Sequence, residues 1–151
     1  MKQFISAFVL LLTVGCVSPI NSPKLSQSNI AVPDENRAVL IIYRKWVPPI
    51  LYPVTAYVDN VEQFSLPNKS FSWVYLEPGE HQVKISWPLL AMTGSKKINI
   101  TIQANKYYFL EFGGSMNATG VGSTFYTSHS FNFSDDIAYK KDVSDCCSLV
   151  K

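Results

Sequence analysis

Two adjacent cysteines near the C-terminus, Cys146 and Cys147, are the residues of this chain best suited to covalent chemistry. Adjacent cysteines can close only a small strained ring, and strained disulfides are reduced more easily than relaxed ones. The dipeptide therefore has three interpretations: a vicinal redox pair, a link between two copies of the chain, or two thiols packed against a sheet. No C-x-x-C or histidine-rich spacing accompanies it, so we predict no metal site.

The chain has only two histidines, so its options for general acid–base catalysis are few. His81 follows a Glu-Pro-Gly-Glu turn and is expected to be a partly exposed turn residue. His129 lies among Phe125, Phe131 and Phe133, where a neutral imidazole hydrogen-bonded to the backbone is expected. No G-x-S-x-G pattern marks a nucleophilic serine. The sequence therefore predicts a protein that is not an enzyme and that needs no cofactor.

The first residues have the composition of an export signal. Lys2 supplies a positive charge, residues 4–12 are apolar, and the small residue Gly15 precedes Cys16. An apolar stretch of this length is too short to span a bilayer and is typical of a secretory signal. One interpretation is an ordinary signal peptide in which the cysteine is incidental.

The run Leu12-Thr13-Val14-Gly15-Cys16 also resembles the bacterial lipobox, although Thr13 stands where that pattern prefers leucine. The resemblance implies that signal peptidase II removes residues 1–15 and that Cys16 carries a diacylglycerol and an amide-linked acyl chain. Several buried acyl chains give stable membrane anchoring. Val17, in place of an aspartate, resembles the sorting pattern for the outer membrane of a Gram-negative host. We therefore expect an outer-membrane lipoprotein that faces the periplasm.

The overall composition fits one globular domain. Of the 151 residues, 47% are hydrophobic, 13% aromatic and 16% charged, which excludes a mostly disordered chain. The net charge of +2 is small and scattered, and no basic stripe with interleaved aromatics is present. We therefore expect no nucleic-acid partner.

The middle of the chain predicts a β-hairpin over residues 71–87. Its turn is Glu77-Pro78-Gly79-Glu80, where the proline presets φ and the glycine accepts a positive φ. Pairing across this turn places four aliphatic side chains on one face of the hairpin. This face is the expected core: Val74, Leu76, Val83 and Ile85.

The other face of the first strand in this hairpin carries an aromatic strip of Phe71, Trp73 and Tyr75. Such a strip is either covered by a second sheet or by the C-terminal helix, or it is open to solvent. An open strip is a platform on which a glycan, peptidoglycan or another small ligand can stack. Ligand binding is thus the alternative function that the sequence allows.

Short strand-like segments recur about every ten residues along the rest of the chain, with turn signals between them. The run from Arg37 to Arg44 is nearly continuously apolar, as expected for a central strand covered on both faces. Further strands are expected at 54–59, 61–66, 96–103, 107–112 and 124–133, with a glycine-rich loop at 113–123. The pattern predicts an all-β, mainly antiparallel fold: an immunoglobulin-like or PEGA-like β-sandwich of about seven to eight strands.

The two ends of the chain differ from this domain, which spans 37–133. Residues 16–36, after the signal peptide at 1–15, are rich in Ser, Asn, Pro and Gln and predict a flexible linker behind the lipidated cysteine. Residues 134–151 predict a short C-terminal helix or tail, with Ser134-Asp135-Asp136 as its N-cap. Its expected apolar contacts are Ile137, Val143, Cys147 and Val150.

Four short motifs over residues 37–112, about half the chain, resemble the bacterial domain-of-unknown-function family 2846. They are Ile42-Tyr43-Arg44, Tyr57-Val58-Asp59, the turn 77–80 with the following histidine, and Asn105-Lys106-Tyr107-Tyr108. The resemblance implies a small envelope lipoprotein with a β-sandwich domain. It implies no catalytic residues, since that family has no established activity.

Strand parity predicts where the connections lie. If each strand runs antiparallel to its predecessor, the loops at 45–53, 66–69, 88–94 and 113–123 gather at one end, opposite the tight turns. The linker would then enter at the tight-turn end, and the long loops would lie away from the tether. Two of these loops are unusually apolar, so they either cap the core or bind an envelope protein; the oligomeric state stays open. The residues concerned are Trp46, Val47, Ile50, Leu51, Tyr52, Trp87, Leu89, Leu90 and Met92.

Overall fold

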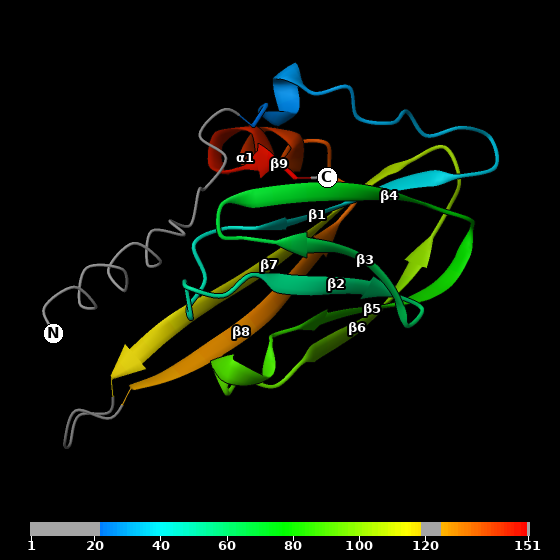
Figure 1. Cartoon of the computed structure of the whole chain (residues 1–151). Coiled ribbons are helices and arrows are strands. Elements are labelled where there is room, and N and C mark those ends of the chain that lie inside the picture. Colours follow the sequence, from blue (N-terminus) through cyan, green and yellow to red (C-terminus); the bar gives the residue numbers. More distant parts are fainter. Residues whose placement is uncertain (1–21, 119–124, 151) are drawn as a thin grey trace, which may run out of the picture.

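Figure 1 shows a computed structural model of the chain, which describes residues 22–118 and 125–150. Two sheets pack face to face and confirm the predicted all-β sandwich. The five-stranded sheet has the order β8 (Phe125–Ser134), β7 (Tyr107–Ala118), β1 (Ala38–Arg44), β4 (Ser70–Leu76) and β9 (Ser148–Leu149). The four-stranded sheet has the order β3 (Val61–Leu66), β2 (Val54–Val58), β5 (Gly79–Ser86) and β6 (Lys96–Ile102). Most neighbouring strands are antiparallel, but β1 pairs in parallel with β7, and β4 with β9.

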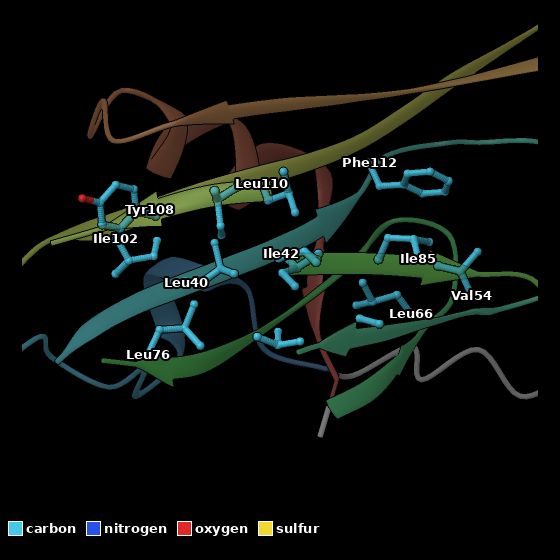
Figure 2. Packing of buried hydrophobic residues seen from close by; sticks show 14 of the residues in the cluster. Leu40, Ile42, Val54, Leu66, Leu76, Ile85, Ile102, Tyr108, Leu110 and Phe112 are labelled. Carbon is cyan, nitrogen blue, oxygen red and sulfur yellow. The ribbon is translucent and has the colours of Figure 1, made fainter. Parts of the chain in front are cut away.

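Strand β1 is the centre of the fold, as predicted. All seven of its residues are buried, because one of its faces contributes to the core between the sheets and the other to a second core. Leu40 and Ile42 point into the first core with Leu110 of β7 and Leu76 of β4, as Figure 2 shows. Val39, Ile41 and Tyr43 belong to the second core. The continuous apolar run in the sequence thus reflects burial on both faces.

The predicted hairpin over 71–87 is wrong. Strand β4 pairs with β1, while β5 pairs with β2 and β6, so the turn at Glu77-Pro78 carries the chain from one sheet to the other. The predicted core face is nevertheless found, because these side chains face each other across the sandwich instead of lying side by side. Leu76, Val83 and Ile85 are buried in the core, and Val74 packs against it.

The outer face of the five-stranded sheet is covered by both ends of the described chain (Figure 1). The segment 22–36, which the sequence assigns to the linker, lies along this face and contains the short 3-10 helix η1 (Leu25–Gln27). Leu25 is 2% exposed and shares the second core with Val143 of helix α1 (Tyr139–Cys146). This part of the predicted linker is therefore packed on the domain.

Helix α1 begins at Tyr139, five residues later than the predicted N-cap at Ser134. The Ser134 hydroxyl instead accepts a hydrogen bond from the amide of Asp136, and the Asp136 carboxylate accepts one from Ala138. Three of the predicted apolar contacts of this tail are packed: Val143 and Cys147 are fully buried, and Val150 lies against the main core. Ile137 is 57% exposed, so that prediction is wrong, because the residue precedes the helix.

Strands β7 and β8 extend beyond the end of β1 as a two-stranded ribbon. Phe112 is the last β7 residue that pairs with β1, whereas pairing with β8 continues to Ala118. Residues 113–118, predicted as part of a loop, are therefore strand; the rest of that predicted loop lies outside the described residues. Gly114 is required here, because a Cβ atom would lie 2.7 Å from the Ser128 carbonyl oxygen and 2.8 Å from a Val47 methyl group.

The predicted separation of the connections holds for the described residues. The segments 45–53, 67–69 and 87–95 lie at one end of the sandwich, which we call the loop end. The segments 59–60, 77–78 and 103–106 lie at the other, the turn end. Asp59 and Asn60 both have positive φ, as a two-residue hairpin turn between antiparallel strands requires.

Candidate functional site

A buried arginine organises the loop end. The guanidinium of Arg44, at the end of β1, donates hydrogen bonds to the carbonyl oxygens of Val47, Pro49, Tyr52 and Leu66, at 2.8 to 3.2 Å. Three of these acceptors belong to the loop 45–53, and the fourth ends β3. One fully buried cation therefore holds an irregular, proline-rich loop in place.

The surroundings of Arg44 are apolar. Its guanidinium carbon lies 4.5 Å from the ring centroid of Trp87. This is a cation–π contact, which stabilises the charged form of the arginine. Burial lowers the pKa of Arg44 to about 10, so the side chain keeps its charge at neutral pH. Its hydrogen bonds to neutral carbonyl oxygens therefore remain charge-assisted.

Asn68 joins two loops at the same end. Its side-chain oxygen accepts a hydrogen bond from the amide of Val47 at 2.8 Å, and its side-chain nitrogen donates to the carbonyl of Ile50 at 3.0 Å. The short segment 67–69 thus supports the long loop 45–53. Together with Arg44, Asn68 gives the loop end a defined backbone although that backbone is neither helix nor strand.

Two of the predicted contact residues, Val47 and Trp87, are core residues, with 0% and 6% exposure. Val47 packs against Gly114 of the β7–β8 ribbon. The Trp87 ring lies 5.3 Å from that of His129, and the His129 ring nitrogen Nε2 forms a 2.8 Å hydrogen bond with the Pro48 carbonyl. His129 therefore bonds to backbone, as predicted, and fastens the loop 45–53 to β8.

The other predicted contact residues lie at the surface of the loop end, where Tyr52 alone is partly covered and packs on the core. Leu89 and Leu90 belong to the short 3-10 helix η2 (Leu89–Ala91), which ends at Met92 in the left-handed conformation. We call the six exposed side chains the apolar loop surface: Trp46 (54% exposed), Ile50 (46%), Leu51 (83%), Leu89 (95%), Leu90 (79%) and Met92 (88%).

Charge is distributed unevenly between the two ends. The loop-end segments 45–53, 67–69 and 87–95 contain no aspartate or glutamate, and Lys45, Lys69 and Lys96 lie in them or next to them. Most of the acidic residues of the chain lie at or near the turn end: Asp34, Glu35, Asp59, Glu62, Glu77, Glu80, Asp135 and Asp136. Lys45 is ion-paired with Glu111 and Asp142, at 3.3 and 3.0 Å, which leaves Lys69 and Lys96 as the basic residues beside the apolar side chains. The domain therefore has an apolar end flanked by lysines and an acidic end.

His81 is held at the turn end. Its two ring nitrogens contact the Asp59 carboxylate at 2.6 Å and the Glu77 carbonyl at 2.9 Å. Partial burial alone would lower the pKa of His81, but the hydrogen bonds to Asp59 and Glu77 outweigh it and raise this pKa. The bond from His81, with one from the amide of Gln82, lowers the pKa of Asp59. The pair of His81 and Asp59 links the β2–β3 turn to β5, and the Glu77 carbonyl occupies the second ring nitrogen.

Cys146 and Cys147 form a disulfide with each other. Cys147 is fully buried in the second core, and its sulfur lies 3.6 Å from the carbonyl oxygen of Arg44, whereas Cys146 is partly exposed. Of the three interpretations from the sequence, the structure agrees with the bond between neighbours, and the redox role of that bond stays a prediction.

The aromatic strip is covered. Phe71 is fully buried, and Trp73 and Tyr75 pack against the second core beneath the N-terminal segment. The guanidinium of Arg37 lies 4.0 Å from the centroid of the Tyr75 ring, and the Tyr75 hydroxyl bonds to the Val32 carbonyl. The three residues therefore do not form an open platform for stacking a sugar or a peptide.

One open recess of about 380 Å³ lies near the turn end, between the edges of β6 and β8. An exposed ion pair of Lys106 and Asp135 borders it, at 3.2 Å. Within residues 22–118 and 125–150, no three His, Cys, Asp or Glu side chains gather as metal ligands. In the same part of the chain, no helix is both long and apolar enough to cross a membrane.

Sequence reasoning named the apolar loop residues but missed the two polar residues that hold them. Arg44 had a visible signal, because a charged residue at the end of a strand buried on both faces needs buried partners. Asn68 had no comparable signal in the sequence apart from its position next to Pro67. Cys16, the residue predicted to be lipidated, lies outside the described residues.

The fold defines the class of this protein: an all-β sandwich with a covered central strand and a short C-terminal helix. The chain belongs to the domain-of-unknown-function family 2846, described as "Protein of unknown function (DUF2846)", whose sequence pattern matches residues 34–124. No curated protein matches the chain. The matched region includes Arg44, Asn68 and the whole apolar loop surface.

Proposed function

We propose that this chain is a non-enzymatic lipoprotein of the cell envelope, held at the outer membrane by acyl chains on Cys16, whose β-sandwich acts by contact with other envelope components. The observation that carries the proposal is the apolar loop surface. Six large apolar side chains are exposed there, and three of them, Trp46, Ile50 and Leu51, lie on the loop 45–53 that Arg44 and Asn68 hold in place. Exposed apolar clusters of this kind mark contact sites.

The anchor is supported by the residues that precede the domain. The run Leu12 to Cys16 resembles a lipobox, and Val17 is compatible with sorting to the outer membrane. Pro23 already lies on the domain, so only a short stretch separates Cys16 from the folded part. A lipid on Cys16 would therefore hold the sandwich close to the membrane surface.

A binding role in place of catalysis is supported by the histidines and Cys147, whose side chains make structural contacts. His81 pairs with Asp59 and a carbonyl, and His129 bonds to the Pro48 carbonyl between aromatic rings. Both imidazoles thereby join structural elements. Cys147, which follows helix α1, is fully buried in the second core and does not line the recess near the turn end.

Mass spectrometry of the chain purified from membranes tests the anchor. We expect the N-terminal peptide to begin at Cys16 and to carry the mass of a diacylglycerol and one further acyl chain. A Cys16→Ser variant should remain unprocessed and unacylated. An unmodified Cys16 in the native protein would refute the proposal.

An envelope protein at the apolar loop surface is the partner predicted from the sequence, and cross-linking in intact cells followed by purification tests it. If a protein occupies this surface, the double variant Trp46→Ser with Leu89→Ser loses its cross-linked partner; in either case its melting temperature should stay nearly unchanged, because both side chains are mostly exposed. The matched control is Val61→Ser with Ile137→Ser, which removes exposed apolar side chains near the turn end. A large drop in the melting temperature of the first variant would show that its residues are core.

A further inference from the structure

The N-terminal segment starts at the loop end. The Pro23 carbonyl accepts a hydrogen bond from Leu149, and Lys24 pairs with Ser148, whose strand partner Ser70 lies opposite Arg44. From there the segment crosses the outer face of the sheet to the turn end, where the Asp34 carbonyl bonds to the amide of Asn105 (Figure 1). The expectation that the long loops lie away from the tether is therefore wrong.

The length of the tether limits how the domain can face a membrane. Seven residue steps separate Cys16 from Pro23, and they span at most about 25 Å when fully extended. Strand β5, with eight residues, is itself about 26 Å long. If the turn end faced the membrane, the tether would have to run back along the whole sandwich at nearly full extension. With the loop end toward the membrane, no such extension is required.

The chemistry of the loop end suits a lipid surface. Four of its exposed side chains are apolar and not aromatic: Leu51, Leu89, Leu90 and Met92. Trp46 is a tryptophan, a residue type enriched at the interface between membrane and water. The loop-end segments carry no acidic residue, and Lys69 and Lys96 flank the apolar side chains. Lysines near the surface are attracted to anionic headgroups, whereas the acidic turn end would be repelled.

We infer that the apolar loop surface inserts into the outermost part of the same bilayer that holds the acyl anchor. This inference rests on the proposed lipoprotein function and assigns the bilayer, in place of a protein, as the occupant of this surface. The anchor then provides most of the binding, and the loop end sets the orientation: Trp46 and the η2 side chains lie in the membrane, the β7–β8 ribbon reaches the membrane from the same end, and the turn end points away from it.

Fluorescence quenching in vesicles tests the orientation. The full lipidated chain is reconstituted, without other proteins, in phosphatidylethanolamine and phosphatidylglycerol vesicles that contain phosphatidylcholine with a nitroxide on its acyl chain. One variant, Leu90→Cys, carries an environment-sensitive label at the loop end. The matched control, Val61→Cys, carries the same label at an exposed aliphatic position near the turn end. The native cysteines do not compete, since Cys146 and Cys147 are bonded to each other and Cys16 is acylated in the proposed form.

We expect the label at position 90 to be quenched at least three-fold more strongly than the label at 61, and its emission to be shifted to shorter wavelength. Adding Leu89→Asp next to it should bring the quenching down to the level of the control. Equal, weak quenching at both positions in a chain with acylated Cys16 would overturn the inference and leave the proposed function standing. An unacylated Cys16 would overturn both. Quenching confined to position 61 would show the opposite orientation and also overturn the inference.

Discussion

Replacing Arg44 tests whether one buried guanidinium holds the loop end together. The change Arg44→Met keeps a long apolar stem but removes all four hydrogen bonds to Val47, Pro49, Tyr52 and Leu66. The bonds to Val47 and Leu66 are fully buried, so these two carbonyls would lose their partner without access to water. The other two acceptors lie nearer to solvent and can turn to water.

The magnitude follows from those two acceptors. A buried polar group left without a partner costs about 1–3 kcal/mol, and removing a buried charge relieves part of its own desolvation cost. We therefore expect Arg44→Met to lower the free energy of unfolding by about 2–5 kcal/mol. Arg44→Lys should recover little of this, because a single ammonium group cannot reach acceptors spread over two loops.

Urea unfolding followed by tryptophan fluorescence measures this loss, with an unchanged m-value as the sign that the same surface is exposed. The matched control is Arg37→Met at the other end of β1, where the guanidinium is 46% exposed and pairs with Asp34. That variant should lose far less stability than Arg44→Met, because an ion pair exposed to water contributes little. Hydrogen exchange at the Val47 amide, which bonds to Asn68, reports the loop directly. Equal losses for the two arginines, or an unchanged Val47 amide, would refute the reasoning.

Two further predictions concern the turn end and the ribbon. Because the pKa of His81 is raised in the folded state, its pair with Asp59 contributes stability below about pH 6.5 that is lost as the pH rises through the folded pKa. The stability difference between the native chain and His81→Gln, measured by thermal unfolding from pH 5 to 9, should therefore shrink with rising pH; a constant difference would contradict it. Gly114→Ala should destabilise by about 1–3 kcal/mol, since the added methyl group meets the Ser128 carbonyl, whereas Gly94→Ala, with open space around it, should change little. Similar melting temperatures for the two alanine variants would contradict this prediction, because they would show that the β7–β8 ribbon moves enough to accommodate the methyl group without loss of stability.

Much of the fold could be predicted from local patterns. The alternating residues Ile98, Ile100 and Ile102 of the expected strand 96–103 all face the core, and Asp59 and Asn60 are residue types that tolerate the positive φ of the β2–β3 turn. Strand β1 was correctly placed at the centre, because only a strand covered on both faces is apolar throughout. These features depend on neighbours within a few residues, so the sequence contains them.

Strand pairing could not be read in the same way. The Glu77-Pro78-Gly79 segment reverses the chain whether the next strand lies alongside or crosses to the other sheet. Both arrangements bury Leu76 and Val83, so the core residues were right although the pairing was wrong. The parallel pairing of β1 with β7 is likewise a contact between residues far apart in the sequence.

The candidate site, too, was predicted only in its local features. The sequence identified the apolar loop residues and their common end of the sandwich, but it did not separate the exposed Leu89 from the buried Trp87. Trp87 is buried because its ring packs against the guanidinium of Arg44 and the ring of His129, whereas Leu89 lies two residues later, in η2. Nothing in the composition of residues 22–36 indicated that Leu25 anchors them across the sheet.

The sequence by itself determined most of the strands, which of their faces are apolar, and which family the chain belongs to, because propensity, period and turn chemistry are local. Only the tertiary structure decided which strands are neighbours and at which end the N-terminal segment starts. These depend on how the outer face of β1 is covered, by Leu25 from one end of the chain and Val143 from the other. Several apolar segments can pack on the same face of a sheet. Which of them does so depends on all of them together, and it cannot be read from any one segment.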